Sequence, residues 1–311
     1  MNKKKLVVLT GPTAVGKTKL SIELAKKIGG EIISADSCQV YKHMDIGSAK
    51  IRPEEMGGIP HFLVDELEPS EEFNVVVFQQ KTKQYMKEIY ERGHIPILVG
   101  GTGFYIQAVL YDIHFSQDDD NHQIRKELES MASEKGPEYM HEELRKIDPA
   151  SANAIHANNV KRVIRALEYY KLTGQRISEH NEEQRNNESP YDFSYFVLND
   201  HRELLYERID KRVDEMIAEG LVDEVKHLKE LGYDRSYVSM QALGYKEIFG
   251  YLEGEISLDE AIYIIKRDTR HFAKRQITWF KREKEVLWVN KPDFDYNNDK
   301  ILDYTYQHIN P

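Results

Sequence analysis

The sequence lacks the residues on which several large protein classes depend. Only one of its 311 residues, Cys38, is a cysteine, so a disulfide framework is excluded and a reducing compartment is favoured. No apolar run approaches the roughly 20 residues of a membrane span. The apolar segment after the basic start MNKKK is also too short for a signal peptide. These absences predict a cytoplasmic protein with no membrane segment.

Positive charge is also scarce, because 43 Lys and Arg residues stand against 53 Asp and Glu residues and the formal net charge is −10. A nucleic-acid partner would therefore need a local basic face. The 40% hydrophobic and 31% charged residues are typical of a soluble globular chain. A length of 311 residues allows one large domain or two modest ones.

The most informative stretch is a phosphate-binding loop near the N-terminus. Residues 6–9 (LVVL) form an apolar run typical of a buried parallel strand, and Leu20 and Leu24 later recur at helical spacing. Between them stands the complete pattern Gly-x-x-x-x-Gly-Lys-Thr. In this context backbone N–H groups and a helix N-terminus bind an anion, Lys17 adds a mobile charge, and the Thr18 hydroxyl can ligate Mg²⁺. The predicted loop consists of Gly11, Pro12, Thr13, Ala14, Val15, Gly16, Lys17 and Thr18.

Strands alternate with helices in the first third of the chain. Further strands are predicted at residues 31–36, 61–65 and 95–99, and a helix at 75–90 with Asn74 as its N-cap. This alternation predicts an α/β fold, a parallel sheet flanked by helices like that of P-loop NTPases. Ligands of such sheets bind at the carboxyl ends of the strands, where the phosphate loop lies.

A helical insertion interrupts this pattern. Residues 117–191 carry no strand pattern; they open with three aspartates at 118–120 and close with a low-complexity run at 181–189. The predicted domains are therefore a first core part at 1–116, an all-helical subdomain at 117–191, and a second core part with C-terminal helices at 192–311. Within the last part we expect strands at 193–198 and 286–289, helices at 221–231, 242–252 and 258–282, and an amphipathic helix whose apolar stripe includes Leu205, Ile209 and Val213.

Asp36 stands at the end of the second predicted strand, near the phosphate loop. Its carboxylate could ligate Mg²⁺, accept a proton or cap a turn, and the neighbouring loop favours a functional role. Ser37 and Gln39 offer hydrogen-bonding groups suited to the edge of a base, and Tyr41 offers a face on which a base could stack. Cys38 is predicted to contribute only its backbone, because no second cysteine or metal-binding pattern accompanies it.

A second glycine-rich turn, residues 100–103 (GGTG), follows a strand and opens a helix. It could be a second anion-binding terminus, or it could simply be a tight turn between strand and helix. The pattern alone does not decide between these.

Two basic faces stand out against the acidic total. Lys161, Arg162 and Arg165 lie within two turns of a helix in the insertion. In the predicted helix 258–282, Arg267, Lys274 and Lys281 recur every seven residues with Arg270 between them, opposite a predicted buried stripe of Ile265, Phe272 and Trp279. Either face alone would be typical of solvated surface. Both faces beside a phosphate loop favour a nucleic-acid backbone as partner.

Eight blocks of sequence, in this order, resemble the bacterial tRNA isopentenyltransferase family. They are GPTAVGKT, DSCQVYKHMDIGSAK, HFLVD, VGGTGFY, KRVIRALE, LYERIDKRVDEMIAEGLVDEV, ALGYKE and KRQITWFKR. The resemblance covers almost the whole chain to about residue 282. Two positions depart from the family pattern: Val15, where Ser is common, and Gly103, where a bulkier residue is often seen.

The resemblance implies a prenyl transfer to tRNA. Dimethylallyl diphosphate would react with the N6 amine of the adenosine 3′-adjacent to the anticodon, in tRNAs that read codons beginning with U, giving N6-dimethylallyladenosine and pyrophosphate. The phosphate loop would then hold a leaving group. Ionisation of an allylic diphosphate puts negative charge there, which loop N–H groups, Lys17 and Mg²⁺ at Thr18 would stabilise.

The resemblance also implies residue roles. Asp36 would be the general base for the adenine amine, Thr13 would lie close to the bridging oxygen of the donor, and Arg208 would assist the diphosphate together with Lys17. The residues implied to bind tRNA are Asp36, Ser37, Cys38, Gln39, Thr102, Arg125, Lys161, Arg162, Arg165, Lys274 and Lys281. For Arg208, the helical pattern alone would favour an ordinary i,i+4 ion pair.

Two other functions fit parts of the sequence. A P-loop kinase that uses ATP on a small molecule or nucleoside would account for the loop and for an insertion acting as a lid. A non-catalytic, nucleotide-dependent RNA-binding protein would account for the two basic faces. The family resemblance favours the transferase, with Mg²⁺ as cofactor, tRNA and dimethylallyl diphosphate as partners, and a monomeric state.

Overall fold

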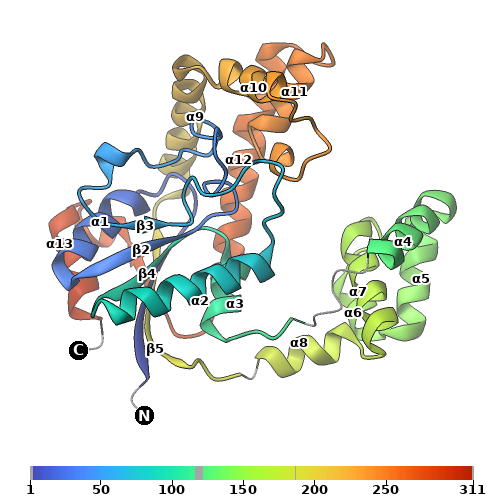
Figure 1. The fold of residues 1–311 in the computed structure, drawn as a ribbon, viewed down its shortest axis with the longest axis horizontal. Coiled ribbons are helices and arrows are strands. Elements are labelled where there is room, and N and C mark those ends of the chain that lie inside the picture. The colour runs from blue at the N-terminus through green and yellow to red at the C-terminus, as the bar shows by residue number, and fades with distance from the viewer. Residues whose placement is uncertain (1–2, 116–121, 186, 310–311) are drawn as a thin grey trace. The chain divides into compact units, whose positions relative to one another are not determined.

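A six-stranded, fully parallel sheet forms the centre of the larger part of the molecule (Figure 1). The computed structural model describes residues 3–115, 122–185 and 187–309. They form two units, one comprising Met1–Val109 and Pro190–Pro311 and the other Leu110–Ser189. The predicted insertion boundaries, 117 and 191, lie near these limits, while the aspartates at 118–120 fall outside the described residues.

The order of the strands across the sheet is β3-β2-β4-β1-β5-β6. The strands are β1 (Lys4–Thr10), β2 (Gly30–Ala35), β3 (His61–Phe62), β4 (Ile95–Gly100), β5 (Tyr191–Asn199) and β6 (Val286–Asn290). Because β1 pairs with β4 and β5 in parallel, the loops after these strands meet at one edge. This confirms the predicted parallel α/β sheet. Ligands of such sheets bind at this edge.

The larger unit also contains helices, some packed on the sheet and others packed on one another. They are α1 (Lys17–Ile28), α2 (Val75–Glu91), α3 (Gly103–Leu110), α9 (Arg202–Glu219), α10 (Leu221–Glu230), α11 (Tyr245–Leu252), α12 (Leu258–Phe280) and α13 (Asn298–Gln307), with short 3-10 turns at Pro53–Glu55, Ser239–Gln241 and Lys291–Phe294. In Figure 1, α2 and α3 lie over the face of the sheet turned to the viewer. As predicted, Asn74 caps α2, since its side-chain oxygen accepts from the N–H groups of Val76 and Val77.

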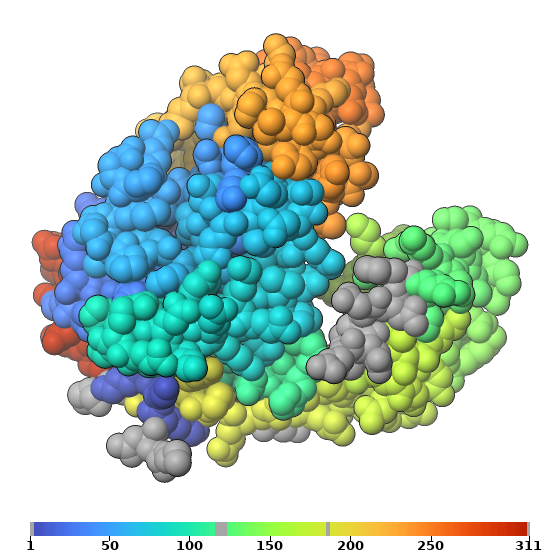
Figure 2. Space-filling model, viewed as in Figure 1, coloured from blue at the N-terminus to red at the C-terminus, as the bar shows by residue number. Residues whose placement is uncertain are grey.

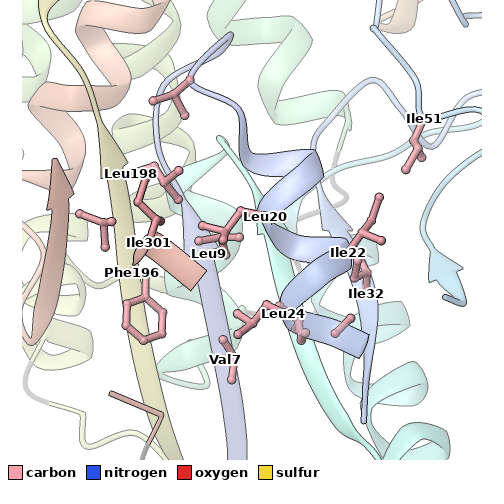
Figure 3. Packing of buried hydrophobic residues seen from close by; sticks show 14 of the residues in the cluster. Val7, Leu9, Leu20, Ile22, Leu24, Ile32, Ile51, Phe196, Leu198 and Ile301 are labelled. Carbon is pink, nitrogen blue, oxygen red and sulfur yellow. The ribbon is translucent and has the colours of Figure 1, made fainter. Parts of the chain in front are cut away.

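The hydrophobic core on the other face is built around β1 and α1. Side chains alternate along a strand, so Val7 and Leu9 point to this face, where they meet Leu20 and Leu24 of α1 (Figure 3). Ile301 of α13 packs into the same cluster. The tail beyond residue 292 gave no prediction, and the structure shows that it closes the core with this helix.

The second half of the chain also carries a support for the loop after β2. The carboxylate of Glu224 on α10 accepts hydrogen bonds from the N–H groups of Asp45, Ile46 and Gly47 at 2.7–3.1 Å, and from the hydroxyl of Tyr245 at 2.7 Å. In Figure 2 the orange residues of the second half lie against the blue residues of the loop after β2. The three bonds to Asp45, Ile46 and Gly47 fix a segment that has little regular structure of its own.

The smaller unit, described by itself, is entirely helical in its described part. Its helices are α4 (His122–Lys135), α5 (Pro137–Ile147), α6 (Pro149–Ala154), α7 (Val160–Thr173) and α8 (Ile177–Arg185). A separate core includes Leu128, Met140, Leu144, Val163 and Leu167. The buried Asp148 joins three segments, because its carboxylate caps α6 at Ser151 and accepts two bonds from Ser178. An independent core of this kind is what an inserted subdomain needs.

Two expectations about individual side chains are wrong. Tyr41 is only 2% exposed and packs edge-to-face on Phe73, so it has no free face on which a base could stack. The buried stripe of α12 consists of Ala261, Ile265, Ala273, Gln276 and Phe280. Phe272 and Trp279 are only partly buried, because the helix presents a slightly rotated face to the core.

Candidate functional site

A polar cavity of about 140 Å³ lies at the carboxyl edge of the sheet, within the larger unit. The phosphate loop forms one wall. The carboxyl end of β4 and the loop after β2 form the others. Its lining residues are Thr13, Ala14, Gly16, Lys17, Thr18, Asp36, Gln39, Ser48, Ala49, Val99, Gly100 and Arg212. The cavity therefore brings together the predicted anion site, the predicted base and one arginine that was not predicted as a site residue.

The phosphate loop has the conformation that its pattern predicts. Gly16 adopts φ +97° and leads directly into α1, so the helix N-terminus opens on the cavity. At Gly11 the carbonyl oxygen of Leu198 in β5 would lie only 2.4 Å from a Cβ, so no side chain fits there. Val15 is fully buried in the core and contributes only its backbone, which explains why a serine is not required at this position.

Two cations face the cavity from different elements. Lys17 Nζ donates to the carbonyl oxygens of Gly11 at 3.0 Å and Pro12 at 2.9 Å. Burial lowers the pKa of Lys17 to about 8; the Asp36 charge opposes this shift and Arg212 adds to it. Burial also lowers the pKa of Arg212, again against the effect of Asp36. Two buried cations whose charges are both disfavoured form a site that an anion stabilises.

Asp36 lies at the carboxyl end of β2 with its two oxygens in different environments. Oδ1 accepts from the N–H of Cys38 at 2.8 Å and, more weakly, from the N–H of Gln39 at 3.4 Å. Oδ2 has no hydrogen-bond partner among residues 3–115, 122–185 and 187–309. The turn-capping role and the functional role are thus compatible, because one oxygen fixes the carboxylate and the other can accept a proton.

The residues after Asp36 serve the cavity in different ways. Gln39 lines it, but its amide is held by Ser34 at 3.1 Å and by the Ala49 carbonyl at 3.3 Å, so it organises the loop. Ser37 is exposed. Burial, together with the Asp36 charge, raises the pKa of Cys38 to about 12, so the thiol stays neutral. This agrees with the prediction that Cys38 is no nucleophile.

The second glycine-rich turn receives side chains of α12. A Cβ on Gly101 would lie 2.0 Å from Nε2 of Gln276, and one on Gly103 would lie 2.2 Å from the ring of Trp279. The close approach of α12 therefore accounts for both glycines, including the departure from the family pattern at Gly103. Thr102, between them, caps α3 with its carbonyl oxygen, which accepts from Tyr105 and Ile106.

The two arginines of α9 have different surroundings. Arg208 forms an ion pair with the buried Asp200 at 2.6 Å and is not among the residues that line the cavity. Lys291 lies near the phosphate loop, since its Nζ donates to the Val15 carbonyl oxygen at 3.4 Å. Burial lowers the pKa of Lys291, and the nearby charge of Arg208 lowers it further. Arg212, one turn after Arg208, lines the cavity itself. Both arginines lie beside the apolar stripe in sequence, so the pattern could not tell them apart.

The predicted basic faces are only partly free. Lys161, Arg162, Lys274 and Lys281 are exposed and form no ion pair with the described residues. Arg165 pairs with the buried Glu168 at 3.1 Å, and Arg125 lies 3.6 Å from Glu129. On α12, Arg267 pairs with Asp268 at 2.7 Å and Arg270 pairs with Asp210. Lys161, Arg162, Lys274 and Lys281 are therefore the cations most available to a polyanion.

A metal ion would find oxygen ligands here but no complete protein cage. The Thr18 hydroxyl and the Asp36 carboxylate line the same cavity, and oxygen is the donor that Mg²⁺ prefers. In the part of the chain that the structure describes, no cluster of three or more His, Cys, Asp or Glu side chains could hold a metal. Mg²⁺ usually keeps waters and substrate phosphates in its shell, so these residues fit that ion.

Comparison with known families matches most of the chain. The model of the IPP transferase family matches residues 39–283. The chain is 66% identical to the tRNA dimethylallyltransferase of Lachnoclostridium phytofermentans, over 96% of this chain and 94% of that protein. It is 53% identical to the tRNA dimethylallyltransferase of Acetivibrio thermocellus, over 96% and 95% of the two chains.

Solved structures agree with these matches. The full-length tRNA isopentenylpyrophosphate transferase of Bacillus halodurans is 46% identical, with a TM-score of 0.74 over 99% of this chain and 97% of that one. A eukaryotic dimethylallyltransferase acting on tRNA is 32% identical, with a TM-score of 0.80 over 94% of this chain and 75% of that one. The similarity in sequence and the similarity in fold thus extend over nearly the whole chain.

Proposed function

Because this chain belongs to the IPP transferase family, whose members include the tRNA dimethylallyltransferases, we propose that it transfers a dimethylallyl group from dimethylallyl diphosphate to tRNA. The acceptor is the N6 amine of the adenosine 3′-adjacent to the anticodon, in tRNAs that read codons beginning with U. The products are N6-dimethylallyladenosine and pyrophosphate. The comparisons do not support the kinase alternative, since the relatives are named for prenyl transfer to tRNA.

The observation that carries this proposal is the pairing of two cations with one carboxylate in a single cavity. Lys17 and Arg212 line the cavity, and burial disfavours both of their charges, so a bound anion would stabilise them. Asp36 has one oxygen that can accept a proton. A diphosphate leaving group needs the cations, and an amine nucleophile needs a proton acceptor. Both requirements of the reaction are met within one site.

In the reaction, the bond between the allylic carbon and the diphosphate oxygen breaks, and its electron pair goes to the leaving group. Lys17, Arg212 and the N-terminus of α1 stabilise the negative charge that develops there. The nitrogen of the adenine amine forms the new bond to carbon, and its proton passes to Oδ2 of Asp36. Oδ1 stays bound to the N–H of Cys38, which keeps the carboxylate oriented during the transfer.

Mg²⁺ is proposed as cofactor, held by the Thr18 hydroxyl, with water and substrate phosphates in the rest of its shell; Asp36 lines the same cavity. When bound, it neutralises part of the negative charge of the diphosphate. Thr13 and the other loop residues are proposed to bind the donor. Arg208 is proposed to act on the diphosphate from outside the cavity, through its neighbour Lys291.

For tRNA, we propose contacts with Lys161, Arg162, Lys274 and Lys281, which are exposed and unpaired among the described residues, and also with Arg125, Arg165, Thr102 and residues 36–39. The helical unit would grip the anticodon stem-loop, while the target base leaves its stack to enter the cavity. A monomer in the cytoplasm suits this role. No helix within residues 3–115, 122–185 and 187–309 is long and apolar enough to cross a membrane.

The test is mass spectrometry of tRNA nucleosides after incubation with dimethylallyl diphosphate and Mg²⁺. We expect N6-dimethylallyladenosine with the wild-type protein and almost none with Asp36→Asn, which preserves the turn but removes the base. ATP replaces the donor in a parallel reaction with nucleosides. Phosphorylation there, with no prenylated adenosine in the first reaction, would reject the proposal in favour of a kinase.

A further inference from the structure

The strongest unassigned contact of the site is made by Gln276, a buried amide on α12 that is 6% exposed. Its Oε1 accepts from the N–H of Thr13 at 2.9 Å, and its Nε2 donates to the carbonyl oxygen of Gly101 at 3.0 Å. One side chain thus joins the phosphate loop to the turn after β4. These two segments are almost ninety residues apart, and they follow the neighbouring strands β1 and β4 at the edge where the cavity lies.

The contact uses a backbone N–H of the phosphate loop, a kind of segment whose N–H groups bind anions. Thr13 N–H is directed to Gln276, so this amide is not free to bind the donor. The anion must then be held by the remaining amides, by Lys17 and by Arg212. The orientation of the peptide at Thr13 is instead set by a side chain that lies more than 250 residues further along the chain.

The lack of a side chain at Gly101 leaves space for the amide of Gln276. A Cβ on Gly101 would overlap Nε2 of Gln276, so the glycine allows the amide to reach the backbone of the turn. Both polar atoms of the Gln276 side chain are paired with backbone groups, so the buried amide has no unsatisfied polar atom. No other common side chain of this length offers one donor and one acceptor from a single planar group.

We propose that Gln276 is a positioning residue that sets the geometry of the phosphate loop at Thr13 and thereby the affinity for the prenyl diphosphate. This deepens the proposed function and rests on it. Gln276 touches neither substrate, and it acts through the Thr13 peptide. Its effect should therefore be seen in binding of the diphosphate and in the KM of the donor, while the KM for tRNA stays unchanged.

The test compares Gln276→Met, which keeps the length of the side chain but loses both hydrogen bonds, with Gln79→Met. Gln79 is a matched control: it is 7% exposed, and its Nε2 donates to the Ala108 carbonyl at 2.7 Å, away from the cavity. Calorimetry measures the Kd for inorganic pyrophosphate with Mg²⁺ at pH 7. We expect Gln276→Met to raise this Kd by about tenfold, and Gln79→Met to leave it within about twofold.

A purely structural role makes a different prediction. Both variants would then lower Tm, and neither would change the pyrophosphate Kd; that result would overturn the inference. Gln276→Asn, which is one methylene shorter and cannot reach both partners, gives the same test if the Met variant fails to fold. Loss of dimethylallyl transfer in the wild-type protein would reject the proposed function. An active wild type with unchanged binding in the variants would reject only the role of Gln276.

Discussion

Lys17 should make binding of the donor depend on pH between about 7 and 9. Burial lowers its pKa to about 8 in the free protein. A bound diphosphate would contact this ammonium and raise its pKa again, because an opposite charge favours the charged form. The perturbation is therefore a rise in pH from 7 to 9, which removes the proton from free Lys17 but not from Lys17 in the complex.

The sign and the size follow from this difference. Below pH 8 Lys17 is already charged and binding needs no proton; above pH 8 the protein must take up one proton to bind. The Kd then scales with 1 + 10^(pH − 8), which gives a factor of roughly ten between pH 7 and pH 9. Affinity is thus full at pH 7 and is lost as the pH rises through 8, by about 1.4 kcal/mol for each further unit.

The assay is calorimetry with a saturated alkyl diphosphate, which cannot ionise at an allylic carbon. The titratable side chains that line the cavity are Lys17, Asp36 and Arg212, and the change is assigned to Lys17 because burial lowers its pKa to about 8. Lys17→Arg is the control, because an arginine stays charged throughout. Its Kd should be weaker but flat between pH 7 and 9. A flat profile in the wild type, or the same slope in both proteins, would refute the reasoning.

Three further predictions test other parts of the site. Asp36→Asn should lower turnover by about 10²–10⁴-fold while tRNA and donor affinities stay close to wild type, as measured by single-turnover kinetics and by binding. Arg212→Ala should lower kcat/KM for the donor by about 10²–10³-fold, whereas Arg208→Ala should cost less than about tenfold; equal losses would contradict the different positions of the two arginines. Arg162→Ala and Lys274→Ala should each weaken tRNA binding and reduce the slope of log K against log salt by about 0.7–0.9; an unchanged slope would mean ordinary solvated surface.

The sequence predicted the elements of this site well because each depends on local chemistry. The phosphate loop has a fixed length and fixed glycines, and Asp36 follows directly from a buried strand. The parallel order of strands follows from their alternation with helices, since a parallel connection needs a crossover. None of these features requires knowledge of a distant segment.

What the sequence could not show are contacts between distant segments. Tyr41 stands two residues beyond the predicted site residues 36–39, yet Phe73 packs against it and removes its free face. Gln276 lies in a helix whose charged face dominates the pattern, so nothing in the spacing points to the amide or to Thr13. Arg208 and Arg212 lie one turn apart on the same helix, and their spacing does not show that Arg208 pairs with Asp200 while Arg212 lines the cavity.

The chemistry of the loop is decided by the groups around it. A phosphate loop alone specifies an anion, and a kinase would use it to hold the phosphates of ATP. Here the carboxylate of Asp36 shares the cavity with Lys17 and Arg212, and its free oxygen can take a proton from a nucleophile. An amine that attacks carbon must lose such a proton, and the electrons of the broken bond must go to a stabilised anion. We therefore propose that the anion held by the loop is a leaving group.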